Sequence, residues 1–168
     1  QALKRLENEC GRLVVADESL VSSYGLPSWL TPDRVASIVA SRFLFKNRNC
    51  TIFDFGTALT VDFIDAQGNF IGGNISLGCR TRFKALNRYS RTLPLLGTPD
   101  DISELGTDIA SAVSSGVISG MTSEIEGYMS KYPENIAVFT GGDAIYFAKR
   151  MKNSIFVVCN LVLMGLAL

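Results

Sequence analysis

The chain has 168 residues, of which 47% are hydrophobic and 19% are charged. A chain with this length and hydrophobic content can bury a single core, so a protein that is disordered throughout is excluded. The 16 basic and 16 acidic residues give a net charge of zero, so no overall charge attracts nucleic acid or an anionic membrane. The sequence contains no histidine, which excludes Ser-His-Asp and Cys-His catalysis and zinc sites with histidine ligands.

The cysteines and the two ends of the chain bear on the compartment. The four cysteines form no Cys-x-x-Cys pair, so neither a zinc ribbon nor a thioredoxin-type motif is present, and we interpret them as reduced thiols. Residues 1–12 lack the apolar stretch of a signal peptide, and the apolar run over residues 155–168 is too short to span a bilayer. We therefore expect a soluble, cytoplasmic protein without a membrane partner. The cysteines are Cys10, Cys50, Cys79 and Cys159.

The first predicted elements are one helix and three antiparallel strands. Residues 22–32 are rich in turn formers, and Thr31-Pro32 has the form of a helix N-cap followed by proline at the first helical position. The apolar spacing that follows predicts a helix over residues 32–44. Strands are predicted over residues 50–53, 58–64 and 70–75, with a hairpin turn at 65–69.

The second half is predicted to alternate helices with strands. A helix is expected around residues 83–89, and a longer one keeps an apolar period of 3.6 residues from Leu105 to Tyr128. Gly116 and Gly120 lie four residues apart in this helix and predict a closely packed neighbour. Strands over 136–140 and 154–159, with a glycine turn and a short helix between them, precede the apolar C-terminal segment. This alternation predicts an α/β fold with a mixed sheet.

Two predicted strands end in glycine-centred turns that suit phosphate binding. Asp54-Phe55-Gly56-Thr57 places a carboxylate, a glycine and a hydroxyl at the end of the first strand. Thr140-Gly141-Gly142-Asp143 leads from a strand into a helix N-terminus, whose amide groups favour a phosphate or a flat nucleotide surface. The alternative for each turn alone is an ordinary structural connection. Two such turns in one small domain favour a nucleotide-binding cleft.

Asp33 and Arg34, in the first turn of the helix over 32–44, are candidates for proton transfer and anion binding. In a chain without histidine, an Asp or Glu is the natural general base for an alcohol nucleophile, and an arginine can pair with an anionic substrate. The alternatives are a carboxylate that complements the helix dipole and an exposed surface charge. The basic cluster over 80–84 does not interleave aromatic residues in the manner of a nucleic-acid-binding surface, so no such partner is expected.

The order of these motifs resembles the type III pantothenate kinases, enzymes of coenzyme A biosynthesis in the acetate and sugar kinase, Hsp70 and actin superfamily. The resemblance runs from about Tyr24 to Leu166. It implies a ribonuclease H-like mixed sheet flanked by helices, as in actin, Hsp70 and the sugar kinases. The matching segments are YGLPSWLTPDR (24–34), DFGTALTVDFID (54–65), GGNISLG (72–78), TGGDA (140–144) and NLVLMGL (160–166).

The resemblance also implies a reaction and its site. The reaction is the ATP-dependent phosphorylation of pantothenate to 4'-phosphopantothenate, with Mg²⁺ and a monovalent cation, potassium or ammonium, as cofactors, in a homodimer. Asp33 would be the catalytic base and Asp54 the cation ligand. Phosphoryl transfer asks mainly for positioning and charge neutralisation, which such groups supply without histidine. The implied pantothenate-binding residues are Tyr24, Thr31, Pro32, Arg34 and Thr107, and the implied ATP-binding residues are Gly56, Thr57, Gly141 and Gly142.

Several positions depart from the family pattern. Thr31 replaces a glycine, Leu77 replaces a proline, and Ile109 stands where the family has a substrate-contacting threonine, for which Thr107 is the candidate substitute. No D-x-G-N-T phosphate motif precedes Asp33. We therefore expect the C-terminal portion of a longer protein, incomplete and inactive on its own. Residues 1–31 would be a remnant of a first subdomain with a turn-rich connection, and 32–168 the ribonuclease H-like kinase domain.

Two other functions stay open. A catalytically inactive relative, acting as a ligand-binding or regulatory module, is favoured by the missing phosphate motif and by Ile109. Another acetate-kinase-type or sugar-kinase-type enzyme would share the phosphate turn but not the Y-x-x-P-x-x-L-x-x-D-R segment. Replacement of Asp33 by Asn separates kinase from binding module, because only the kinase would lose turnover.

Overall fold

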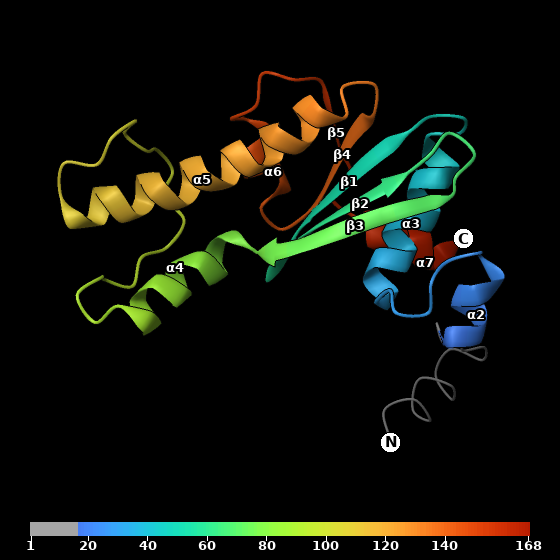
Figure 1. Cartoon of the computed structure of the whole chain (residues 1–168), viewed down its shortest axis with the longest axis horizontal. Helices are drawn as coiled ribbons and strands as arrows, with labels where there is room; N and C mark the ends of the chain where they lie inside the picture. Colours follow the sequence, from blue (N-terminus) through green and yellow to red (C-terminus); the bar gives the residue numbers. More distant parts are fainter. Residues whose placement is uncertain (1–16) are drawn as a thin grey trace.

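The computed structural model describes residues 17–168, so the predictions for residues 1–16 and for Cys10 lie outside the described residues. Figure 1 shows the order of the elements along the chain. They are α2 (Glu18–Ser23), α3 (Pro32–Leu44), β1 (Cys50–Phe55), β2 (Ala58–Ile64), β3 (Phe70–Leu77), α4 (Cys79–Tyr89), α5 (Ile109–Lys131), β4 (Ile136–Gly141), α6 (Ala144–Ala148), β5 (Ile155–Val157) and α7 (Leu161–Ala167).

The five strands form one mixed sheet in the order β3-β2-β1-β4-β5. Strand β2 is antiparallel to both β1 and β3, whereas β4 is parallel to β1 and β5 is parallel to β4. Only β2 therefore runs against the other strands. This order and these directions are those of the ribonuclease H-like fold, which confirms the predicted fold class.

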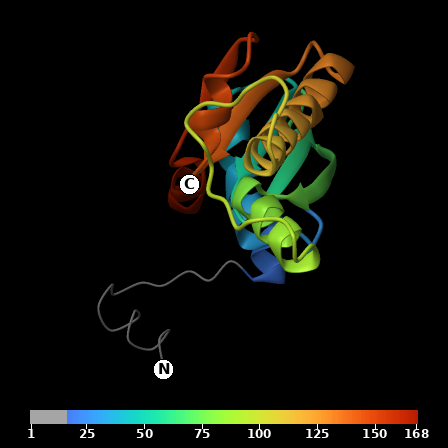
Figure 2. The same ribbon diagram turned by 90° about the vertical axis from the view of Figure 1, so that its left-hand side faces the viewer.

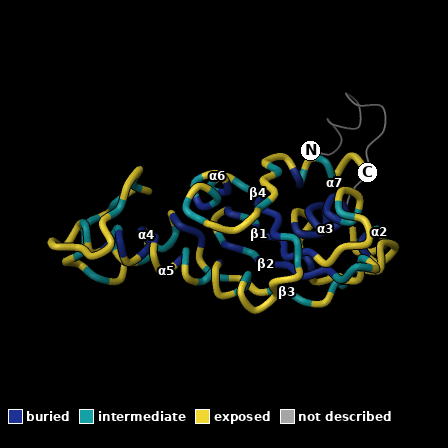
Figure 3. The backbone as a smooth tube through the Cα atoms, turned by 90° about the horizontal axis from the view of Figure 1, so that it is seen from above, coloured by how far each residue is buried: buried dark blue, intermediate teal, exposed yellow. Residues whose placement is uncertain are grey.

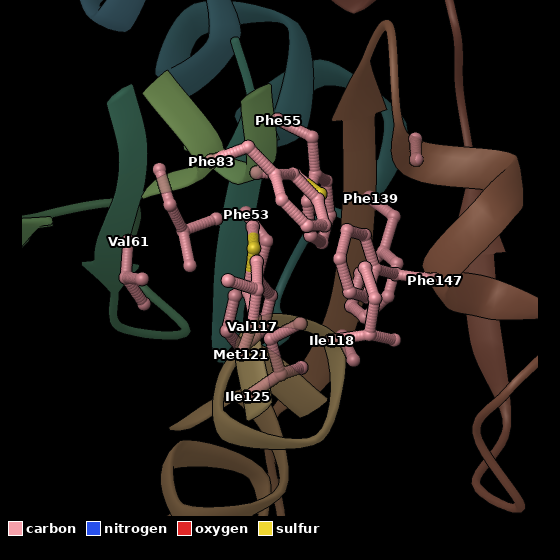
Figure 4. Packing of buried hydrophobic residues seen from close by; sticks show 14 of the residues in the cluster. Phe53, Phe55, Val61, Phe83, Val117, Ile118, Met121, Ile125, Phe139 and Phe147 are labelled. Atoms are coloured by element: carbon pink, nitrogen blue, oxygen red, sulfur yellow. The ribbon is translucent and has the colours of Figure 1, made fainter. Parts of the chain in front are cut away.

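Helices cover both faces of the sheet, and each face has its own core (Figures 1 and 2). On one face, α4, α5 and α6 pack against aromatic residues of β1 and β4. The ring centroid of Phe55 lies 4.9 Å from that of Phe139 and 5.3 Å from that of Phe147. Figure 4 shows these rings together with Phe83 of α4 and the apolar side chains of α5. The alternation of side chains along β1 thus directs Phe53 and Phe55 to this core.

The opposite face is covered by α2, α3 and α7. Small buried residues on α3, among them Ala36 and Ala40, allow α7 to approach closely. A Cβ atom added at Gly165 of α7 would overlap the backbone of Ala36. Val21 and Leu26 lie in the same core, so the described part of residues 1–31 packs on the sheet domain. The predicted boundary at residue 31 stays a prediction.

The α4–α5 arm, which we define as α4, the N-terminal half of α5 and the loop between them (residues 79–120), extends beyond the ends of the strands (Figure 1). Figure 3 shows more exposed residues along it than in the sheet. An apolar groove of ≈ 660 Å³ runs between its two helices. The predicted close neighbour of Gly116 and Gly120 is wrong for the described residues, because none of their atoms lies within 4 Å of a Cβ at either glycine.

The start of the longest helix also differs from the prediction. Helix α5 begins at Ile109, and Leu105 lies before it with 78% of its surface exposed. The Asp108 side chain accepts hydrogen bonds from the N–H groups of Ala110 and Ser111, at 2.9 and 3.0 Å. This N-cap ends the helical period four residues later than the apolar spacing indicates.

Most other boundaries confirm the sequence prediction. Helix Pro32–Leu44 and strand Ala58–Ile64 have the predicted bounds, and three strands run slightly longer than predicted. The last strand is shorter, at Ile155–Val157, and helix Glu18–Ser23 was not predicted. Within residues 17–168, no helix combines the length and the apolar character needed to cross a membrane.

Candidate functional site

The candidate site lies where β1 and β4 end, beside the N-terminus of α3. These parallel strands pair through Asp54 and Thr140, so their carboxyl ends meet at one edge of the sheet. Because successive side chains of a strand point to opposite faces, Asp54 of β1 and Asp62 of β2 point away from the α5 core and toward α3. Asp33 opens α3 on the same face and is exposed. The fold therefore gathers three carboxylates from separate elements.

One of these carboxylates is held in a buried ion pair. The Asp62 carboxylate accepts hydrogen bonds from Arg34 Nε, at 3.2 and 3.1 Å to its two oxygens, and from Arg34 Nη2 at 2.5 Å. The Arg34 and Asp62 side chains are 3% and 2% exposed. The guanidinium carbon lies 5.1 Å from the ring centroid of Trp29, within the range of a cation–π contact. Arg34 is therefore a fixed group rather than a mobile surface charge.

The glycine opposite this pair is a steric requirement. Gly73 pairs with Asp62 across the β2–β3 ladder. A Cβ atom at Gly73 would overlap the Asp62 carboxylate, and it would lie 2.6 Å from Arg34 Nη2. Contacts this short do not occur between ordinary side-chain atoms, so the bare backbone of β3 makes room for the ion pair.

The two predicted glycine turns meet at Asp54. Gly141 has a φ of +89°, and a Cβ there would lie 2.5 Å from Asp54 Oδ1 and 2.7 Å from the backbone nitrogen of Phe55. A side chain is disfavoured by this backbone conformation as well as by the contact. The carboxylate at the end of β1 therefore rests directly against the turn at the end of β4, and the neighbouring Gly142 is exposed.

Burial raises the pKa of Asp54, and the negative charges of Asp33 and Asp62 raise it further. Burial also raises the pKa of Asp62, against the opposing hydrogen bonds and charge of Arg34. The site thus carries more negative charge than Arg34 alone neutralises, and a bound cation would relieve this repulsion.

The turn after β1 is fixed by the start of α4. Gly78 N–H donates to the carbonyl of Thr57 at 3.0 Å, and Thr81 Oγ donates to the same carbonyl at 2.7 Å. A Cβ at Gly78 would overlap the carbonyl oxygen of Gly56. Gly56 and Thr57 themselves are exposed. An anion at the strand ends would therefore meet a preformed turn.

The donor set at Asp54 is compatible with a cation that binds together with substrate. Among residues 17–168, no three His, Cys, Asp or Glu side chains form a metal-ligand cluster. Mg²⁺ in phosphoryl-transfer sites is usually held by one or two carboxylates, with substrate phosphates and water completing its shell. Asp54 supplies such a carboxylate, and its crowding by negative charge favours a cation there. Asp62 is less suited because Arg34 occupies both of its oxygens.

The remaining predicted residues are divided between this site and other places. Thr31 and Pro32 are exposed at the start of α3. Tyr24 ends α2 and lines, with Pro32, a hollow of ≈ 440 Å³ against α7. Thr107 precedes α5, whose first turn lies at the far end of the arm from the sheet (Figure 1), and its N–H donates to Ser111 Oγ at 3.0 Å. The structure thus gathers Asp33, Arg34, Asp54 and the glycine turns, but not Tyr24 and Thr107.

Asp62 and Gly73 were not singled out from the sequence. A signal for Asp62 was present, because it is the one carboxylate inside the apolar run from Leu59 to Ile64, and a buried carboxylate requires a partner. For Gly73 the sequence offers only a glycine within a strand, which indicates close approach of some other group. Asp143, half-buried at the start of α6, also lies here, and burial raises its pKa against the opposing charge of Arg80.

Comparison with known proteins decides the family. The sequence model of the family described as type III pantothenate kinase matches residues 13–131, which include Asp33, Arg34, Asp54, Asp62 and Gly73. The chain belongs to the type III pantothenate kinase family. This finding confirms the resemblance on which the sequence interpretation rests.

Relatives within the type III pantothenate kinase family are similar over most of this chain. The type III pantothenate kinase of Flavobacterium johnsoniae is 39% identical over 150 residues, which cover 87% of this chain and 62% of the relative. That of Phocaeicola vulgatus is 41% identical over 147 residues, covering 85% and 61%. The chain thus spans less than two thirds of the length of these relatives.

A solved structure shares the fold. A conserved Campylobacter jejuni protein, assigned to the Baf family of transcriptional activators, superimposes with a TM-score of 0.64 at 23% identity, over 83% of this chain and 62% of that one. This likeness supports the fold of this type III pantothenate kinase family member and says nothing of its activity.

Proposed function

We propose that the protein catalyses the ATP-dependent phosphorylation of pantothenate to 4'-phosphopantothenate, the first step of coenzyme A biosynthesis. The observation that carries the proposal is the match of the family model across the segments that hold Asp33, Arg34 and Asp54. The gathering of these residues at the strand ends supports it. Nothing in the described structure favours the inactive alternative.

In the proposed reaction, the exposed carboxylate of Asp33 accepts the proton of the primary hydroxyl of pantothenate. The hydroxyl oxygen then forms a bond to the γ-phosphorus of ATP, and the bond from that phosphorus to the bridging oxygen breaks, leaving ADP. Arg34 binds the anionic part of pantothenate, assisted by Thr31, Pro32, Tyr24 and Thr107. Gly56 and Thr57 face the phosphates, and Gly141 and Gly142 lie against the adenosine.

Asp54 is the proposed cation ligand. Mg²⁺ and a monovalent cation, potassium or ammonium, would supply positive charge to the phosphates when bound. Support comes from the raised pKa of Asp54, because burial and the nearby Asp33 and Asp62 make an additional positive charge favourable there. Without such a charge, three carboxylates and the transferred phosphate would repel one another.

Assembly and compartment are also proposals. A homodimer is supported by the apolar groove between α4 and α5 and by exposed apolar side chains such as Leu86 and Ile109 on the arm. A cytoplasmic location is supported by the free thiols of the described cysteines, Cys50, Cys79 and Cys159. Small molecules are the proposed ligands, with no nucleic acid or membrane among the partners.

The test compares the parent chain with Asp33→Asn. ADP release that depends on pantothenate should fall by about 10²–10⁴-fold in the variant, the usual contribution of a general base, while calorimetry should detect pantothenate binding to both. Asp101→Asn is the matched control, since Asp101 is exposed in the loop between α4 and α5.

Two results would count against the proposal. Undiminished turnover in Asp33→Asn would remove the base from the mechanism. A folded parent chain that shows neither turnover nor pantothenate binding would refute the proposed function for this chain.

A further inference from the structure

We propose that Asp62 and Gly73 form a positioning unit, which fixes the Arg34 guanidinium so that Nη1 is presented to the carboxylate of pantothenate. The inference rests on the proposed function for the identity of the ligand. The arrangement of the three residues rests on the structure alone. Asp62 and Gly73 touch no substrate in this proposal and act through Arg34.

The first step of the argument is the way in which the guanidinium is held. Asp62 engages Nε and Nη2, which lie on one edge of the planar group. Two hydrogen bonds to one edge fix both the position and the plane of an arginine. A single hydrogen bond would leave the group free to rotate, so the paired edge is what gives Arg34 a defined direction.

The second step concerns the nitrogen that remains. Within residues 17–168, Arg34 Nη1 makes no hydrogen bond. In the same part of the chain, the buried side-chain nitrogens and oxygens that lack a partner belong to Ser37, Ser41 and Arg42. Because Nη1 is not one of them, it retains solvent access although its residue is 3% exposed. The guanidinium therefore offers one accessible, charged donor.

The third step is the enclosure of the pair. Trp29 covers the guanidinium at 5.1 Å, and its own ring is largely exposed. On the other side, the backbone of β3 passes at Gly73, where any side chain would displace either Asp62 or Nη2. Gly73 and Trp29 thus restrict the guanidinium from two directions, and Asp62 restricts it from a third.

The fourth step is the charge of the surroundings. Asp33 and Asp54 lie close enough to raise the pKa of neighbouring carboxyl groups, so an anionic substrate entering this site meets repulsion. A fixed cationic donor at Arg34 compensates for it in one direction only. The arrangement therefore predicts that the carboxylate of the substrate, and not its hydroxyl end, is directed to Arg34, which leaves the hydroxyl for Asp33.

The test measures the preference for a carboxylate. Calorimetry gives the affinity of each protein for pantothenate and for panthenol, in which an alcohol replaces the carboxylate. The parent should prefer pantothenate by about 10- to 100-fold, the value of a hydrogen bond to a charged group. Asp62→Asn should lose this preference, with its affinity for panthenol unchanged.

A double-mutant cycle separates positioning from a general structural effect. Arg34→Gln should lose the same preference, and adding Asp62→Asn to it should change nothing more, because Asp62 acts only through Arg34. The double variant also replaces the ion pair by two neutral amides, so it avoids an uncompensated buried charge. If Asp62→Asn alone does not fold, Asp62→Glu keeps the charge and moves the guanidinium, and it should lose part of the preference.

The outcomes distinguish the two proposals. A parent chain that prefers pantothenate, together with a folded Asp62→Asn or Asp62→Glu that keeps the full preference, would overturn the positioning role and leave the proposed function intact. Additive losses in the cycle would do the same. A folded parent that binds neither compound would overturn the proposed function, and the positioning role with it.

Discussion

The glycines at the strand ends and those of the α4–α5 arm make opposite demands on the chain. At Gly73, Gly78 and Gly141, a Cβ atom would meet backbone or charged atoms at distances that side chains do not adopt. At Gly116 and Gly120, no atom of the described residues lies within 4 Å of the same position. Glycine serves close approach in the first region, whereas in the second nothing within the described chain requires it.

The largest effect is expected for Gly141→Ala, which acts in the crowded region. The new methyl group would lie 2.5 Å from Asp54 Oδ1, on a backbone with positive φ. We expect the free energy of unfolding to fall by about 2–4 kcal/mol from strain and overpacking together. Urea denaturation followed by circular dichroism measures the change. Gly142→Ala is the matched control, since the nearest atom to its Cβ lies at 3.9 Å, and equal losses in both variants would contradict the argument.

A smaller effect of opposite sign is expected for Gly116→Ala on the arm. Alanine is favoured over glycine inside a helix by about 0.8–1.0 kcal/mol, and the open space at Gly116 imposes no steric cost. The same denaturation experiment should therefore show a gain in stability, with Gly120→Ala behaving alike. A loss that grows with protein concentration would instead show that a second chain covers this face, which would sharpen the proposal of a homodimer.

The smallest effect, and the one that depends on pH, is expected for Asp54→Asn. The pKa of Asp54 is raised in the folded protein by burial and by Asp33 and Asp62, so the folded state binds this proton more tightly than the unfolded state. Parent stability therefore declines as pH rises from about 4, the usual value for Asp, through the raised pKa. Asn has no such proton, so the variant should be more stable than the parent at pH 7.

The pH series supplies the check on this sign. The advantage of Asp54→Asn should vanish as the pH approaches 4, where the Asp54 carboxyl is protonated in both states. Asp101→Asn, at an exposed loop position, should show no such trend. An advantage that persists unchanged at pH 4 would mean that repulsion at Asp54 is not the cause.

Local patterns in the sequence predicted the elements better than the contacts. The bounds of Pro32–Leu44 follow from a proline in the first turn and an apolar period, which are properties of the segment itself. Leu105 was assigned to α5 because its spacing fits the period, but the Asp108 cap competes with that pattern and prevails. Helix Glu18–Ser23 escaped prediction because six residues hold too little periodicity to detect.

The candidate site was predictable in its residue types and not in its geometry. Asp33, Arg34 and Asp54 were found because chemistry and family motif point to the same residues. The Arg34–Asp62 pair could not be found in this way, since it depends on which face of β2 turns toward α3 and on the register that places Gly73 opposite Asp62. A shift of that register by one residue would send Asp62 to the other face.

The strand order has a consequence for how the chain reaches its native state. Strands β1, β2 and β3 are joined by short turns and can pair soon after collapse, whereas β1 must wait for β4, which follows the whole of α4 and α5, before Cys50 pairs with Ile136. Contacts between distant segments form slowly because a long loop must close first. Until then, the free edge of the β1–β2–β3 meander is open to pairing with other chains. Refolding yield should therefore fall with protein concentration during this interval, and a fast phase of sheet formation should precede the one that completes the site at Asp54.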